Sequence, residues 1–190
     1  MSCVLLDTNS IFVRNLKIAG SSLNSLILKE KKFKTIWLSL SQYKNPHINL
    51  SQIIDILGEE RIYNFWTFTI VRNPWDWFVS LFFYIKTKID HPLYYLTTNF
   101  DYFVVEYCKK HVLKQEYFVY YNNYAVDHVF KFEELHIYWP LLKEKLKFKE
   151  DIKKTNTTSH KNYQYYYNNT TKNLVFKYEN RIIKDFKYEF

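Results

Sequence analysis

This sequence has few glycines and cysteines. Only two glycines occur in 190 residues, and neither lies in a GxxxxGK[ST] phosphate loop, so a standard ATPase is disfavoured. Two cysteines are too few for a disulfide framework, and Cys108 with His111 lacks the second pair of ligands that a structural metal site needs. We therefore expect no disulfide framework and no bound metal.

Long apolar runs are also absent. No window approaches the roughly 18 apolar residues of a membrane helix, so we expect no membrane span. The opening MSCVLLDTNSIFV has no basic segment, and Asp7 and Asn9 interrupt its apolar residues, unlike a signal peptide. We expect a soluble, cytoplasmic protein. Without internal repeats or an obvious linker, residues 1–190 are expected to form a single domain.

Basic residues outnumber acidic ones. The chain has 27 Lys and Arg against 19 Asp and Glu, a formal net charge of +8 and a pI near 9.2. This balance favours an anionic partner, whether nucleic acid, a phosphorylated cofactor or an acidic polysaccharide. Aromatic residues make up 21% of the chain, so a single aromatic side chain does not indicate a binding site.

The hydrophobic pattern predicts alternating strands and helices. Short apolar segments predict strands at Ser10–Arg14, Phe33–Leu40, Phe65–Val71 and Val126–Phe132. Apolar residues at helical spacing predict helices at 23–27, 50–58, 74–89, 99–114, 138–146 and 171–186. We expect an α/β fold of three layers, with a central, mostly parallel sheet flanked by helices.

The first candidate site is the loop NLKIAGSS, between a predicted strand and helix. Gly20 lets the backbone turn without a side chain in the way, and successive N–H groups can form an anion nest. Lys17, Ser21 and Ser22 add donors, and the carboxyl ends of strands are where open α/β sheets bind ligands. We predict that Gly20 makes room for an oxyanion; the alternative is an ordinary turn with an exposed lysine.

The second candidate site follows the buried strand Phe65–Val71. Asn73 is a natural N-cap and Pro74 suits the first position of a helix, which places Arg72 at the junction. Its guanidinium can clamp a phosphate, and Ser80, on the face away from the apolar stripe, can bond a ligand or water. The alternative is a surface arginine and a solvated serine.

Two segments together closely resemble the two cofactor motifs of sulfotransferases that use 3′-phosphoadenosine 5′-phosphosulfate (PAPS), particularly the carbohydrate-type members. These segments are FVRNLKIAGSSL and FWTFTIVRNPWDWFVSLFFYI. The resemblance continues through VFKFEEL and spans roughly Ile11 to Phe190. It implies a P-loop-NTPase-like sulfotransferase fold, PAPS as cofactor, adenosine 3′,5′-bisphosphate as product, and a hydroxyl acceptor on a glycan or glycoconjugate.

The resemblance also implies roles for single residues. Lys17 would lie at the bridging oxygen of the 5′-phosphosulfate, while Arg72 and Ser80 would hold the 3′-phosphate that distinguishes this cofactor from ATP. Trp77 departs from the pattern, because many relatives have arginine there. The other cofactor-binding residues implied are Ala19, Gly20, Ser21, Ser22 and Leu23 in the first loop, and Asn156, Thr158 and Lys161 near the C-terminus.

Sulfuryl transfer needs a base and a stabilised leaving group. The acceptor oxygen attacks in line, and a positioned lysine stabilises the charge on the leaving phosphate. His47, just before the helix at 50–58, is the first candidate for the base that takes the acceptor's proton, because the carbohydrate-type family often has its base there. Glu133 is the second. The alternatives are a solvated loop histidine and a structural partner for a basic group.

Two other functions stay open at this point. A non-catalytic relative would bind a nucleotide or sugar without turnover. A basic nucleic-acid-binding protein would contact phosphates through lysines and stack bases on the tyrosines that follow them. The lysines concerned are Lys143, Lys145, Lys147, Lys149, Lys153, Lys154 and Lys161.

Overall fold

The computed structural model describes residues 1–38, 47–110, 112–152 and 160–190. The chain groups into two compact units. The first comprises Met1–Val71 and Tyr117–Asn156, and the second comprises Arg72–Glu116 and Thr157–Phe190. The expectation of a single domain stays a prediction.

A five-stranded sheet is the centre of the first unit, in the order β3-β1-β2-β4-β7. Strands β2, β4 and β7 are parallel, whereas β1 is antiparallel to both β2 and β3. The α/β class is confirmed, but the sheet is mixed rather than mostly parallel. The strands are β1 (Ser2–Leu5), β2 (Ser10–Val13), β3 (Thr35–Leu38), β4 (Trp66–Val71) and β7 (His128–Lys131).

Strand β1 was not predicted, and it explains the mixed sheet. Only residues 6–9 join it to β2, and such a short connection can link antiparallel neighbours but not parallel ones. Asn9 completes the reversal in a left-handed conformation, with φ of 45°. A small hairpin, β5 (Tyr120–Tyr121) with β6 (Tyr124–Ala125), was also not predicted.

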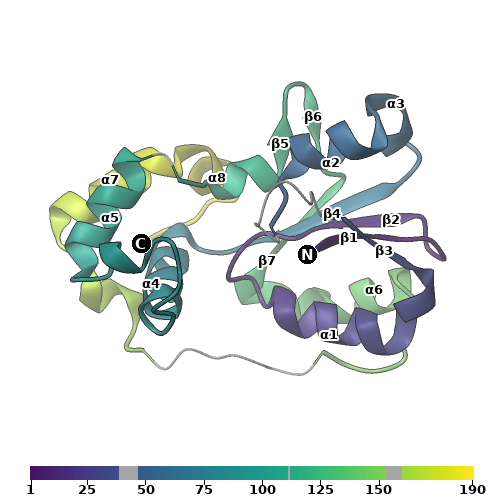
Figure 1. The fold of residues 1–190 in the computed structure, drawn as a ribbon, viewed down its shortest axis with the longest axis horizontal. Helices are drawn as coiled ribbons and strands as arrows, with labels where there is room; N and C mark the ends of the chain where they lie inside the picture. The colour runs from purple at the N-terminus through teal and green to yellow at the C-terminus, as the bar shows by residue number, and fades with distance from the viewer. Residues whose placement is uncertain (39–46, 111, 153–159) are drawn as a thin grey trace. The chain divides into compact units, whose positions relative to one another are not determined.

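Helices cover both faces of this sheet. Helices α1 (Gly20–Lys31) and α6 (Leu135–Lys145) lie on one face, and α2 (Leu50–Leu57) and α3 (Glu59–Ile62) lie on the other (Figure 1). Side chains from α1 and α6 pack against the sheet in one buried cluster that includes Phe12, Phe68 and Phe130. Short 3-10 turns, η1 (Lys32–Lys34) and η4 (Phe132–Glu134), adjoin β3 and α6.

Local sequence signals set several boundaries as predicted. Helix α2 begins at a capping box in which the side chains of Asn49 and Gln52 bond each other's backbone amides. It ends at Gly58, whose φ of 89° suits glycine. Strand β4 is buried along almost its whole length, as its continuous apolar run predicts.

The second unit is helical. Helices α5 and α7 pack side by side, and α4 contacts both (Figure 1). Trp77 is fully buried and meets Phe78 and Tyr107 edge to face, with ring centroids 5.2 and 6.0 Å apart. The helices of the second unit are α4 (Pro74–Lys86), α5 (Phe100–Lys109), α7 (Asn169–Tyr178) and α8 (Asn180–Asp185). It also contains the 3-10 turns η2 (Tyr94–Leu96) and η5 (Tyr163–Tyr166). In the turn η3 (Gln115–Phe118), the first two residues belong to the second unit and the last two to the first.

Other predicted boundaries were wrong by several residues. Helix α6 begins at Leu135, not Tyr138, and α5 ends at Lys109, not Lys114. The predicted C-terminal helix is two helices separated at Glu179, and its first cap is Asn168. Thr171, the first residue of the predicted helix, is instead the third helical residue, and its Oγ1 accepts from the Asn168 amide at 3.2 Å.

The described residues contain no helix long and apolar enough to cross a membrane. Within the same ranges, no group of three or more His, Cys, Asp or Glu side chains is placed to hold a metal ion. Cys3 and Cys108 are buried free thiols, and burial raises the pKa of each to about 12.

Candidate functional site

The first candidate site is the loop of residues 14–19, which joins β2 to α1. Lys17 and Ala19 are left-handed, with φ of 56° and 59°. This conformation costs a residue with a Cβ about 1–2 kcal/mol. The amides of Ser22 and Leu23 donate to the Ala19 carbonyl at 2.9 and 3.2 Å, which closes the first turn of α1. The backbone that turns in this loop therefore belongs to lysine and alanine, not to glycine.

Gly20 does not supply the left-handed turn of this loop. It is the first residue of α1, and its φ is not positive. A Cβ added at Gly20 would lie 2.5 Å from Nε of Arg14 and 3.0 Å from its Cγ. The absence of a Cβ at Gly20 thus gives space to the Arg14 side chain, and the prediction that Gly20 makes room for an oxyanion stays a prediction.

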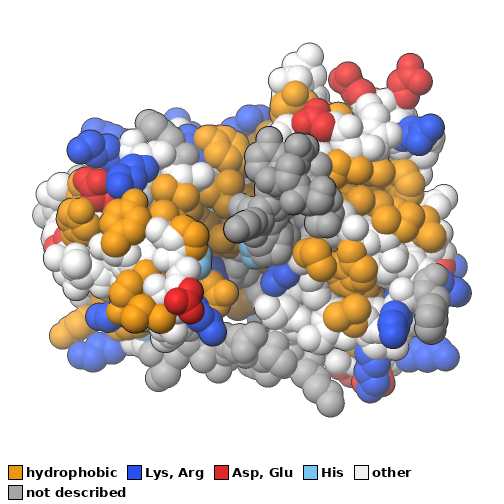
Figure 2. Space-filling view, viewed as in Figure 1, with side chains coloured by type: hydrophobic (Ala, Val, Ile, Leu, Met, Phe, Trp, Pro, Cys, Tyr) orange, Lys and Arg blue, Asp and Glu red, His pale blue; other side chains and the backbone are white. Residues whose placement is uncertain are grey.

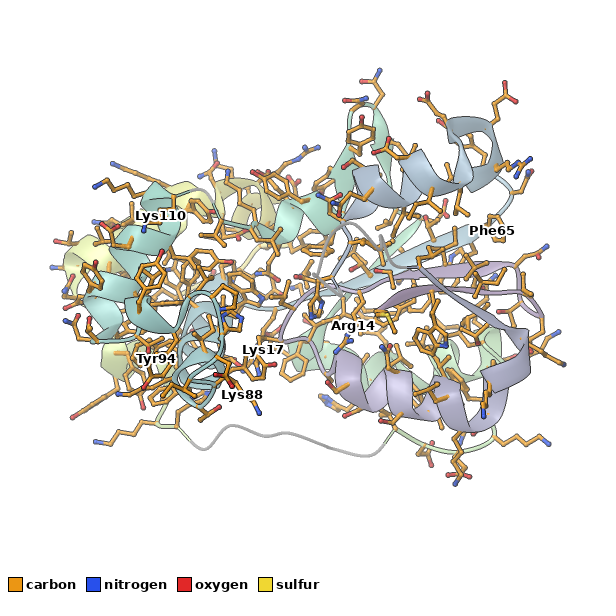
Figure 3. The ribbon with its side chains drawn as sticks, viewed as in Figure 1. Arg14, Lys17, Phe65, Lys88, Tyr94 and Lys110 are labelled. Atoms are coloured by element: carbon orange, nitrogen blue, oxygen red, sulfur yellow. The ribbon has the colours of Figure 1, made fainter. Side chains whose placement is uncertain are left out.

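Arg14 is a candidate residue that the motif analysis missed. Its Nη2 donates to Oγ of Ser21 at 3.2 Å, and its backbone amide donates to Oγ of Ser2 at 2.9 Å. Figure 3 shows Arg14 and Lys17 on the same loop. Arg14 directly follows a buried strand, which is the signal that identified Arg72.

Asn15 anchors the loop to the neighbouring strand. Its side chain is fully buried, and Nδ2 donates to the carbonyl of Ile70 in β4 at 3.3 Å. Its Oδ1 accepts from the Leu16 amide at 2.7 Å. These bonds hold the backbone just ahead of Lys17 against the parallel strand β4.

The start of α1 is suited to an anion. In the described structure its N-cap, Ala19, gives no side-chain cap bond, and its first turn contains no acidic residue. In α4, by contrast, the Asn73 side chain caps the helix and Asp76 lies in the first turn. The positive end of α1 is therefore not offset by its own side chains. The amides of Gly20 and Ser21, with Lys17 and the exposed Ser21 hydroxyl, form a donor set that fits a phosphate or sulfate.

The second candidate site begins at Arg72, directly after β4. Its side chain is 11% exposed, so Arg72 is not a surface arginine. Nε and Nη2 contact Oδ2 of Asp76 at 2.8 and 2.7 Å. An anion at Arg72 would share the guanidinium with this carboxylate.

Ser80 does not lie on a solvated face. It is 1% exposed, because α4 is buried on nearly all sides from Pro74 to Phe82. The apolar stripe therefore does not define an outward face at this position. The prediction that Ser80 lies away from the buried side of α4 was wrong.

The two candidate bases have different surroundings. His47 is partly buried, so it is not a solvated loop histidine, and its pKa is lowered to about 3 by burial first and then by Arg14 and the N-terminal ammonium. Such a histidine is neutral at pH 7 but accepts a proton less readily than a base with a pKa near 7. Glu133 is exposed in η4, just after β7.

The C-terminal residues of the predicted site are described only in part. Asn156 and Thr158 lie outside the described residues. Lys161 is exposed, and its Nζ lies 3.9 Å from the centroid of the Tyr165 ring, a cation–π contact. Its amide donates to the hydroxyl of Tyr166 at 3.1 Å.

No family model, curated protein or solved structure matches this chain. The resemblance to sulfotransferases therefore rests on the quoted motifs. The structure places Arg14, Lys17, Ala19 and Ser21 around the start of α1, and Ser22 and Leu23 buried in its first turn.

Proposed function

We propose that this protein is a PAPS-dependent sulfotransferase, with a P-loop-NTPase-like sulfotransferase fold, that acts on a hydroxyl group of a carbohydrate. The observation that carries the proposal is the pairing of the two strands that precede the motif loops. Strands β2 and β4 are adjacent and parallel, from Ser10 opposite Trp66 to Val13 opposite Thr69. Both therefore end at the same edge of the sheet, where open α/β sheets bind ligands.

The first loop would take the 5′-phosphosulfate. The uncapped start of α1 and the hydroxyl of Ser21 supply hydrogen bonds, and Lys17 supplies the charge. Two left-handed residues in this short loop support a binding role, because backbone strain is often concentrated at ligand sites.

The 3′-phosphate would be held by Arg72 and Ser80. A guanidinium carries five N–H donors, so Arg72 can keep its contact with Asp76 and still donate to a phosphate. Ser80 lies on α4, eight residues after Arg72, and is 1% exposed.

PAPS, if held by these residues, would supply an activated sulfuryl group to the acceptor oxygen, and adenosine 3′,5′-bisphosphate would be the leaving product. Lys17 stabilises the negative charge that develops on the 5′-phosphate of this product. A base takes the proton of the acceptor hydroxyl. His47 and Glu133 stay the candidates, and the low pKa of His47 argues against its acting as a strong base.

Calorimetric titration with adenosine 3′,5′-bisphosphate tests the proposal, with AMP and ATP as controls. Tight binding of the bisphosphate, with much weaker binding of AMP, would support a 3′-phosphate site. Equal affinities for the bisphosphate and AMP, in a folded sample, would contradict it. Transfer of a labelled sulfuryl group to acceptor sugars then separates an enzyme from a non-catalytic binding protein.

Arg72→Ala gives this titration its sharpest control. The variant should weaken bisphosphate binding by about 1.5–3 kcal/mol, the usual contribution of a charge-assisted hydrogen bond, and leave AMP binding unchanged. Arg61→Ala is the matched variant, because it removes an exposed arginine and the same charge. Equal losses in both variants would assign the effect to net charge alone.

Two lysines of the nucleic-acid-binding alternative have partners within the protein. Lys143 contacts Asp151 at 2.8 Å, and Nζ of Lys145 lies over the Trp66 ring at 5.2 Å, so both lysines have intramolecular contacts. Figure 2 shows lysine and arginine side chains scattered over the visible face rather than gathered in one patch. Salt-dependent binding to mixed oligonucleotides remains its test.

A further inference from the structure

The backbone of Arg72 is held by a buried side chain from a distant part of the sequence. The Arg72 amide donates to Oε1 of Gln115 at 3.0 Å, and Nε2 of Gln115 donates to the Arg72 carbonyl at 2.9 Å. Gln115 is fully buried. One primary amide thus satisfies both backbone groups of Arg72, as a neighbouring strand would.

Gln115 is in turn held by a buried carboxyl group. Its backbone amide donates to Oε1 of Glu179 at 3.1 Å, and Glu179 is 1% exposed at the corner between α7 and α8. The Glu179 backbone is fixed there as well: its amide donates to the Val175 carbonyl and its carbonyl accepts from the Ile183 amide. Arg72, Gln115 and Glu179 therefore form one continuous hydrogen-bonded chain within the second unit.

The far end of Arg72 has a separate restraint. Oδ2 of Asp76 accepts from Nε of Arg72 at 2.8 Å, so the side chain is oriented by α4 while the backbone is oriented by Gln115. A guanidinium recognises a phosphate through directed N–H groups, so an error of even 1 Å in its position weakens that recognition.

We propose that Gln115 and Glu179 are positioning residues that orient Arg72 for recognition of the 3′-phosphate. The inference rests on the proposed function for its ligand, but the hydrogen-bonded chain itself can be tested without any ligand. Neither residue belongs to the motifs that suggested the cofactor.

The charge state of Glu179 is compatible with this role. Burial raises the pKa of Glu179 to about 8, although the hydrogen bond from Gln115 opposes the shift. The carboxyl is therefore mainly neutral at pH 7, and glutamine is a close mimic that keeps an oxygen to accept from the Gln115 amide.

The binding test compares four variants by titration with adenosine 3′,5′-bisphosphate and AMP. Gln115→Met and Glu179→Leu remove the hydrogen bonds and should weaken bisphosphate binding about tenfold or more, with AMP binding unchanged. Glu179→Gln keeps the acceptor oxygen and should bind both nucleotides as tightly as the wild type. Thr171→Val is the control, because it removes a buried hydrogen-bonding side-chain group of this unit that does not contact Arg72, and it should change neither affinity. A general packing defect would instead weaken both ligands together.

Amide hydrogen exchange supplies the second measurement. The Arg72 amide should exchange about tenfold faster or more in Gln115→Met than in the wild type, while amides in the middle of α5 stay protected. Unchanged exchange at Arg72, or equal losses of bisphosphate and AMP affinity, would overturn the inference. If the wild-type protein fails to distinguish the two nucleotides, the proposed function fails, and the exchange result alone decides whether Gln115 positions Arg72.

Discussion

At the scale of single residues, the Arg14 side chain lies where a Cβ at position 20 would be placed, and this favours glycine there. Gly20→Ala should destabilise the protein by about 1–3 kcal/mol, since the new methyl group would overlap Nε and Cγ of Arg14. Urea unfolding measures the loss.

The double variant with Arg14→Ala gives the test its control. Once the arginine is shortened, Gly20→Ala should cost little or even stabilise α1, because alanine favours a helix over glycine by up to about 1 kcal/mol. The same loss in both backgrounds would show that the overlap with Arg14 is not the cause.

Lys17 combines a proposed catalytic charge with a left-handed backbone, and two substitutions separate these properties. Lys17→Ala and Lys17→Gly should both abolish sulfuryl transfer, because both remove the ammonium group. Lys17→Gly should be at least as stable as the wild type in urea, since glycine adopts a φ of 56° without steric cost. Lys32→Ala, on the exposed turn after α1, is the charge-matched control. Wild-type turnover in either Lys17 variant would remove this residue from the mechanism.

At the scale of secondary-structure elements, Asn73 shows how a cap fixes the helix that follows β4. Its side chain accepts from the Trp75 amide at 3.1 Å and donates to the Glu189 carbonyl at 2.9 Å. Asn73→Ala should reduce the free energy of unfolding by about 1–2 kcal/mol, measured in urea.

Asn73→Asp distinguishes the two bonds, because aspartate keeps the cap acceptor but cannot donate to Glu189. It should retain most of the stability. If aspartate and alanine prove equally destabilising, the bond to Glu189 matters more than the cap.

At the scale of the whole molecule, two buried groups should make the free energy of unfolding depend on pH. The pKa of Glu179 is raised to about 8, so its contribution to stability is fully present below its unfolded pKa near 4.5 and is lost as the pH rises through about 8. The pKa of His47 is lowered to about 3, so its contribution is present above pH 6.5 and is lost as the pH falls through about 3.

Glu179→Gln should therefore flatten the loss of stability between about pH 5 and pH 8. A single group can contribute at most about 1.4 kcal/mol per pH unit in that window. Urea unfolding at several pH values measures the slope, and Glu60→Gln, at an exposed carboxylate, should leave it unchanged. An unaltered slope in Glu179→Gln would contradict the raised pKa.

The sequence by itself determined the features that depend on neighbouring residues. The Asn73–Pro74 start of α4, the Gly58 end of α2 and the buried strand β4 were all predicted, because caps, φ preferences and apolar runs act over a few residues. The same locality identified Lys17 and Arg72 as candidates.

Only the tertiary structure decided which distant residues meet. Strand β1 pairs on both sides, Ser80 is buried, and Arg14 occupies the space beside Gly20. Gln115 reaches Arg72 across 43 positions of sequence. No local pattern encodes such contacts, because a hydrogen bond or a packed side chain depends on where the folded chain brings its partner, not on the residues beside it.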